Sequence, residues 1–226
     1  NDVTVTATPA AATAQYTYAF KQWNNLPATV TANVTNVQAE FTRTARSYNL
    51  TWVTDGDALT GTYTKGTVAY GTSITQPNTP TKTGYTFAGW HNGSSVVTPS
   101  TMPAANTTYT ATWTEKSYAV TFNNGGHGTV AVAGATVANG ATASVNHFTT
   151  KSLEATASTG YTFAGWTTTG SVTLGSTSAA STTIKTTAAG GTVTATWTPI
   201  SYTITYNNLE GASNSNPANY NIESAN

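Results

Sequence analysis

The chain contains no cysteine among its 226 residues. This absence excludes disulfide bonds, thiolate nucleophiles and cysteine-ligated metal sites together. Charge is scarce as well: eight Lys and Arg balance eight Asp and Glu, so that 7% of the chain is charged and the formal net charge is zero. Because nucleic acids and anionic lipid surfaces are bound mainly through clustered basic side chains, the composition argues against both as partners.

Long apolar runs are missing too. No run approaches the ~20 residues that a membrane-spanning helix needs, and the first residues lack the basic and apolar regions of a signal peptide. We therefore expect any anchor or export signal to lie outside this segment. Thr is the commonest residue type, so the surface is expected to carry hydroxyl and amide groups in place of charges.

What the chain does have is an internal repeat. The eight residues Thr83–Trp90 return letter for letter as Thr159–Trp166. A Ser-Tyr segment with alternating large side chains begins three times, at Ser47, Ser117 and Ser201. These starts are about 70 and about 84 residues apart, spacings that suit small independent domains better than a solenoid.

The dominant sequence period is two. Large apolar residues alternate with Thr or small residues in the opening segments and in the closing Thr-Ala-Thr-Trp segments that end at Trp113 and Trp197. Such alternation is typical of strands with one face in a core and one in water. Turn formers such as Asn123-Asn124-Gly125-Gly126 separate the strands, and no run of twelve residues has helical periodicity. The sequence therefore predicts a mainly β fold.

Both ends of the chain contain parts of the same repeat. Tyr18–Trp23 stands in place of the central block, with Lys21-Gln22 where the other copies have Ala-Gly, and Val37–Phe41 stands in place of the closing strand. Gly permits a kink that returns the Trp to the core. Because the first copy lacks this Gly, its sequence does not decide whether the kink is present there. We expect the back part of a degenerate repeat, a full repeat, a divergent repeat and the front part of a further repeat, at residues 1–46, 47–115, 116–199 and 200–226.

The two partial repeats together hold about 72 residues, close to one full repeat. Two explanations follow. The favoured one is that this segment is an excerpt from a longer array. The other is that the ends of neighbouring molecules complete each other head to tail.

These blocks carry a family resemblance. The opening Tyr-x-Val-Thr-Phe, the Gly-Tyr-Thr-Phe-Ala-Gly-Trp block and the closing Tyr-Thr-Ala-Thr-Trp resemble the Listeria–Bacteroides repeat, also called the internalin B-repeat; residues 117–198, with Gly125–Val130, resemble its divergent form. The resemblance implies small β-grasp-like (ubiquitin-like) domains, strung in tandem on large bacterial surface proteins as stalks, spacers or adhesive modules. It implies no catalytic residues.

Candidate chemistry is sparse. His91, His127 and His147 have no metal-ligand spacing and are expected to be solvated or in loops. Asp55-Gly56-Asp57 could ligate Ca²⁺, but a plain turn is favoured because no third carboxylate lies near in sequence. We therefore expect no enzyme, no catalytic, cofactor or metal residues, and no bound cofactor; ligand-binding residues stay unknown.

The aromatic residues allow two interpretations. Exposed rings could bind a glycan, but we expect a core role for the tryptophans because they recur at repeat markers: Trp23, Trp52, Trp90, Trp113, Trp166 and Trp197. Intramolecular Lys–Asn cross-links are disfavoured by the few Lys.

The sequence thus favours a structural stalk or shaft segment of an extracellular bacterial surface protein, acting by extension as a semi-rigid rod with neighbouring repeats as its partners. One alternative is an adhesin module that binds a host protein, a glycan or another copy of itself by strand addition. A second alternative is a non-catalytic accessory domain of a secreted enzyme.

Overall fold

The structure is a computed structural model that describes residues 4–207, 210–211 and 213–224. Every regular element in these residues is a β-strand, which confirms the predicted mainly β class. No helix in them is long and apolar enough to cross a membrane. The chain forms two compact units, Asn1–Thr114 (unit 1) and Glu115–Asn226 (unit 2), each described by itself below.

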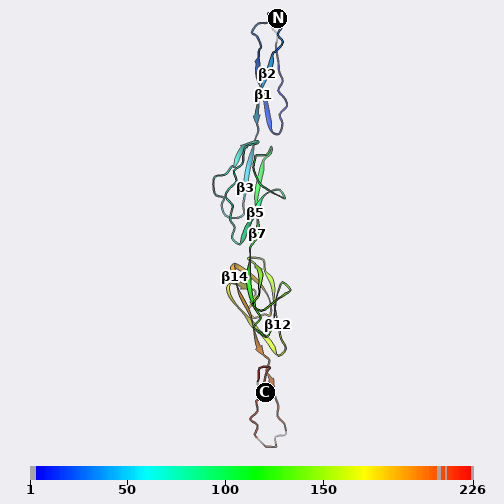
Figure 1. Cartoon of the computed structure of the whole chain (residues 1–226), viewed down its shortest axis with the longest axis vertical. Coiled ribbons are helices and arrows are strands. Elements are labelled where there is room, and N and C mark those ends of the chain that lie inside the picture. Colours follow the sequence, from blue (N-terminus) through cyan, green and yellow to red (C-terminus); the bar gives the residue numbers. More distant parts are fainter. Residues whose placement is uncertain (1–3, 208–209, 212, 225–226) are drawn as a thin grey trace. The chain divides into compact units, whose positions relative to one another are not determined.

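Unit 1 contains two sheets (Figure 1). The first is an antiparallel hairpin, here called the N-terminal hairpin, of β1 (Tyr16–Asn24) and β2 (Gln38–Ala45). The second has the strand order β4-β3-β7-β5-β6. Its strands are β3 (Ser47–Val53), β4 (Gly66–Ala69), β5 (Tyr85–Asn92), β6 (Ser95–Val97) and β7 (Thr107–Glu115).

The core of unit 1 follows from the alternation along these strands. In β3, Leu50 and Trp52 are buried while Thr51 between them is exposed. β3 runs parallel to β7, with Trp52 opposite Tyr109. The Trp52 ring lies edge-on to Trp90 at 4.7 Å between centroids. An opening strand and a closing strand far apart in sequence therefore meet over one aromatic cluster.

Unit 2 contains a seven-stranded sheet in the order β10-β9-β12-β14-β8-β11, with β13 also paired to β14. A short pair, β15 (Tyr202–Thr203) and β16 (Asn219–Tyr220), follows it. The strands of the large sheet are β8 (Ser117–Asn123), β9 (Gly128–Val132), β10 (Ala135–Val137), β11 (Thr142–Asn146), β12 (Lys151–Ala157), β13 (Tyr161–Leu174) and β14 (Ser181–Pro199).

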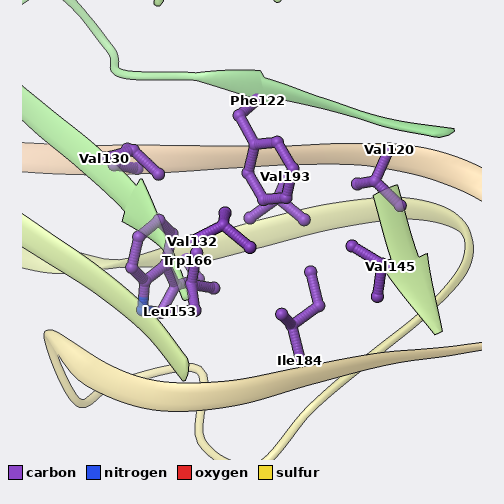
Figure 2. Packing of buried hydrophobic residues seen from close by; sticks show 10 residues of the cluster. Val120, Phe122, Val130, Val132, Val145, Leu153, Trp166, Ile184 and Val193 are labelled. Atoms are coloured by element: carbon purple, nitrogen blue, oxygen red, sulfur yellow. The ribbon is translucent and has the colours of Figure 1, made fainter. Parts of the chain in front are cut away.

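The core of unit 2 repeats the arrangement of unit 1 with different side chains. β8 is parallel to β14, and Phe122 stands opposite Val193 as Trp52 stands opposite Tyr109 in unit 1. Figure 2 shows Phe122, Val193 and Trp166 within one apolar cluster. Aliphatic residues from β9, β11 and β12 complete it: Val130, Val132, Val145 and Leu153.

The kink expected in the central block is present. The register of β13 against β14 shifts between Phe163 and Gly165, and Gly165 has a φ of +151°. The Thr196 hydroxyl donates to the Gly165 carbonyl at 2.8 Å. In the N-terminal hairpin, where the sequence did not decide whether a kink is present, the register also shifts between Phe20 and Gln22. The bulge thus forms there without glycine.

Candidate functional surfaces

The histidines lie apart from one another and in different surroundings. His91 is on β5, and His127 stacks on Tyr161 with 4.0 Å between ring centroids. His147 lies in the bend that follows β11, so it is in a loop as expected, but it is only 5% exposed and contacts the rings of Tyr118 and Phe148. It continues the inward alternation of β11, which the sequence did not reveal. The described residues contain no group of three or more metal-ligating side chains.

The paired carboxylates at Asp55 and Asp57 are held by the protein itself. The Lys82 ammonium group contacts the Asp55 carboxylate, and its hydrogen bond holds the pKa of that carboxyl below its usual range. The Thr81 hydroxyl donates to the Asp57 carboxylate, and the Asp57 N–H donates to the Thr81 carbonyl at 2.8 Å. Lys82 also lies over the Tyr85 ring at 4.7 Å. This geometry favours a structural turn over a cation site.

Glu115 is an anchoring residue that the sequence did not single out. Its carboxylate accepts hydrogen bonds from the Thr149 hydroxyl and N–H at 2.7 Å each, from the Phe148 N–H, and from the Asn146 side chain at 3.2 Å. These donors, the Thr149 hydroxyl foremost, lower the pKa of Glu115 from 4.5 to about 2. The only signal in the sequence was an acid in the short link Thr114-Glu115-Lys116.

An open groove of about 420 Å³ lies beside β3 in unit 1. Trp52 forms part of its wall and donates from Nε1 to the Thr64 carbonyl at 2.7 Å. Tyr63 lines it as well, with the Lys65 ammonium 4.9 Å from the ring centroid. Its lining offers one cation, Lys65, and no carboxylate.

Five of the six tryptophans belong to the two cores, as predicted: Trp52, Trp90, Trp113, Trp166 and Trp197. Trp23 is the exception, because it is only half-buried and belongs to neither cluster. Its neighbours in the N-terminal hairpin, Phe20 and Phe41, are 40% and 38% exposed. The hairpin therefore presents an uncovered aromatic face, the most distinctive surface in the described part of the chain.

Both units are built of β-strands and share one feature, an opening strand parallel to a closing strand, which defines them as related all-β repeat domains. Residues 48–113 match the Listeria-Bacteroides repeat domain, and residues 118–201 match the divergent InlB B-repeat domain. The chain belongs to this repeat family in both its forms. No solved structure matches the chain. Since these repeats occur in bacterial surface and extracellular proteins, the chain is classed as an extracellular repeat module.

Proposed function

We propose that this segment is a stalk or shaft element of an extracellular bacterial surface protein, which acts by extension and performs no catalytic step. In this proposal each repeat at 1–46, 47–115, 116–199 and 200–226 is one bead of a semi-rigid array. The observation that carries the proposal is the junction at Arg46 within unit 1.

At this junction a single residue separates two sheets, since β2 ends at Ala45 and β3 begins at Ser47. The Arg46 N–H donates to the Gln15 carbonyl at 2.9 Å, and its own carbonyl accepts from the Tyr70 N–H at 2.7 Å. Its guanidinium group donates to the Thr13 carbonyl at 3.2 Å. A one-residue link held at three points resists bending far more than a flexible linker of Gly and Ser.

A comparable junction follows the large sheet of unit 2. The Ile200 N–H donates to the Gly160 carbonyl at 2.8 Å. The Tyr161 hydroxyl donates to the Glu223 carboxylate at 3.0 Å, and Ile222 lies against Gly160. In both junctions the residue before the opening strand is bound to the turn that precedes the central block. This recurrence supports a fixed geometry between successive repeats.

We further propose that the repeats are β-grasp-like in strand order. The support is that the opening strand lies parallel to the closing strand inside the sheet, as β3 with β7 and β8 with β14. The described residues add no helix to this arrangement, so the likeness concerns the strands.

Small-angle X-ray scattering of the dilute chain tests the extension. A compact globule of this length would have a radius of gyration of about 17 Å, and we expect a value well above it together with the scattering profile of a stiff rod. A radius near the globular value would overturn the proposal.

A further inference from the structure

Three Asn-Gly pairs occur in the sequence: Asn92-Gly93, Asn124-Gly125 and Asn139-Gly140. Asn is one of the thermally labile residue types. When Gly follows Asn, no side chain hinders the Gly main-chain nitrogen from attacking the carbonyl carbon of the Asn side chain. The three pairs therefore share one latent reaction, and the fold decides which of them can undergo it.

The pair Asn92-Gly93 lies exposed at the turn between β5 and β6. Asn92 pairs with Ser95, so Gly93 and Ser94 form a two-residue loop, in which Gly93 has a φ of +62°. Gly is typical of the first position of one such hairpin loop. Within the described part of the chain, neither the Asn92 side chain nor the Gly93 N–H has a hydrogen-bond partner.

The space around this turn is open as well. Apart from the chain neighbours of Gly93, no atom lies within 4 Å of a Cβ built on it. The attack requires the Asn92 side chain and the following peptide group to rotate toward each other. Because nothing is packed against the turn, this rotation breaks no tertiary contact.

The pair Asn124-Gly125 is held in place on both sides. The Asn124 side-chain oxygen accepts a hydrogen bond from the Gly126 N–H at 3.0 Å, and its main-chain carbonyl accepts one from Trp197 Nε1 at 2.6 Å. A Cβ on Gly125 would lie 2.3 Å from the Ala195 carbonyl oxygen, so this Gly packs directly against β14. Rotation of the turn would break these contacts.

The pair Asn139-Gly140 is hydrogen-bonded at both reacting groups. The Asn139 side-chain oxygen accepts from the Asn124 N–H at 2.9 Å. The Gly140 N–H, which contains the attacking nitrogen, donates to the Phe122 carbonyl at 2.8 Å. Since this hydrogen bond must open before the nitrogen can attack, the fold protects the pair although Asn139 is exposed.

We propose that Asn92 is a site of spontaneous deamidation in the folded protein. The Gly93 N–H gives its proton to hydroxide, and the nitrogen then attacks Asn92 Cγ. The bond between Cγ and Nδ2 breaks, and Nδ2 takes up a proton from water and leaves as ammonia. Water then opens the resulting succinimide ring at either carbonyl, which gives aspartate or isoaspartate. Water is the only co-reactant, and no oxidant or reductant takes part.

This modification changes both the charge and the backbone at one edge of the sheet in unit 1. Each conversion adds one negative charge to a chain whose formal net charge is zero. Isoaspartate also adds a methylene group to the main chain of the turn that begins β6, the edge strand Ser95–Val97. β6 pairs with β5 through three positions, the first of which is Trp90 with Val97. The modified turn therefore acts on the strand pair beside the buried Trp90.

Peptide mapping of the full-length chain by mass spectrometry tests the proposal. The folded protein is incubated in warm, mildly alkaline water enriched in ¹⁸O, and residue 92 should take up one labelled oxygen because ring opening adds water. We expect Asn92 to convert at least about tenfold faster than Asn124 or Asn139, since each protected pair must first lose a hydrogen bond. The product should elute from an anion exchanger as a more acidic species.

The unfolded chain in concentrated guanidinium chloride is the matched control, because it removes the fold and keeps all three Asn-Gly pairs. The three sites should convert at similar rates there. Asn92→Ser keeps a polar residue beside the turn but has no side-chain carbonyl, so it should abolish the acidic species that the folded chain forms.

Three outcomes would overturn the proposal. In the first, Asn92 stays unchanged in the folded chain, whether or not the unfolded chain converts. In the second, Asn124 or Asn139 converts in the folded chain as fast as Asn92 does. In the third, the rate at Asn92 does not rise with the hydroxide concentration, which would contradict attack by the deprotonated Gly93 nitrogen.

Discussion

Trp90 and Trp166 show how one residue can hold a repeat together. Each is 4% exposed, and each contacts the Phe three positions before it, Phe87 or Phe163. A buried ring of this size removes ~150–250 Å² from water. Trp23 contacts the equivalent residue Phe20 but is only half-buried. Equivalent residues in the three copies should therefore contribute unequally to stability.

Trp90→Ala should lower the free energy of unfolding of unit 1 by about 3–5 kcal/mol, because it leaves a large cavity in a closed core. Trp23→Ala should cost about 1 kcal/mol in dilute solution, where the half-buried ring has less contact to lose. Denaturant titration of both variants at the same low concentration measures the difference. Equal losses would show that the hairpin is as tightly closed as the complete repeat.

Glu115 gives unit 2 a dependence on pH. Its pKa is about 2 in the folded state and about 4.5 ordinarily, a lowering caused mainly by the Thr149 hydroxyl and N–H donors. A carboxyl whose folded pKa is depressed stabilises the fold above its unfolded pKa. That stabilisation is complete above about pH 5 and is lost as the pH falls toward 2.

Glu115→Gln should therefore destabilise unit 2 by about 1–2 kcal/mol at pH 7, because a charged acceptor of several hydrogen bonds is lost. Thermal unfolding followed by circular dichroism should show the stability gap between the wild type and this variant closing as the pH falls from 5 to 2. Glu154→Gln, at an exposed position of β12, should show no such gap. A gap that is unchanged at pH 2 would contradict the role assigned to the Glu115 carboxylate.

At the scale of the strand, the bulge in the central block decides which side chains of that strand face the core. Gly165 has a φ of +151°, a region that L residues rarely adopt, and a Cβ added there would lie 3.1 Å from the Thr177 carbonyl oxygen. The bulge lets Phe163 and Trp166 face the same core although three positions separate them. In β1 the corresponding residue is Gln22, which is not among the described residues with positive φ.

Gly165→Ala should cost about 1–3 kcal/mol, since it forces a side chain into a strained backbone conformation. Gln22→Ala at the matching bulge of β1 should change stability by under about 0.5 kcal/mol. Urea midpoints of the two variants make the comparison. A tolerated Gly165→Ala would mean that the bulge can relax without loss of core packing.

At the scale of the whole molecule, the proposed stalk function rests on how rigidly one repeat is joined to the next. The Arg46 junction uses two backbone hydrogen bonds and one guanidinium contact within unit 1. Replacing Arg46 with Gly-Ser-Gly-Ser should remove all three and leave the hairpin on a flexible tether. Scattering in Kratky form should then rise at high angle, while far-ultraviolet circular dichroism stays unchanged. An unaltered profile would show that rigidity at this point does not depend on Arg46.

The sequence alone determined the repeat, the strand faces, the core tryptophans other than Trp23 and the glycine kink of the two complete repeats, because each follows from local alternation or from a residue type with special backbone freedom. Tertiary structure alone decided that His147 is buried, that Glu115 gathers the donors of residues 146–149, and that Phe20, Trp23 and Phe41 of the N-terminal hairpin stay partly exposed. Burial depends on which distant segment lies against a face. Short-range periodicity marks a face as apolar but carries no information about its partner.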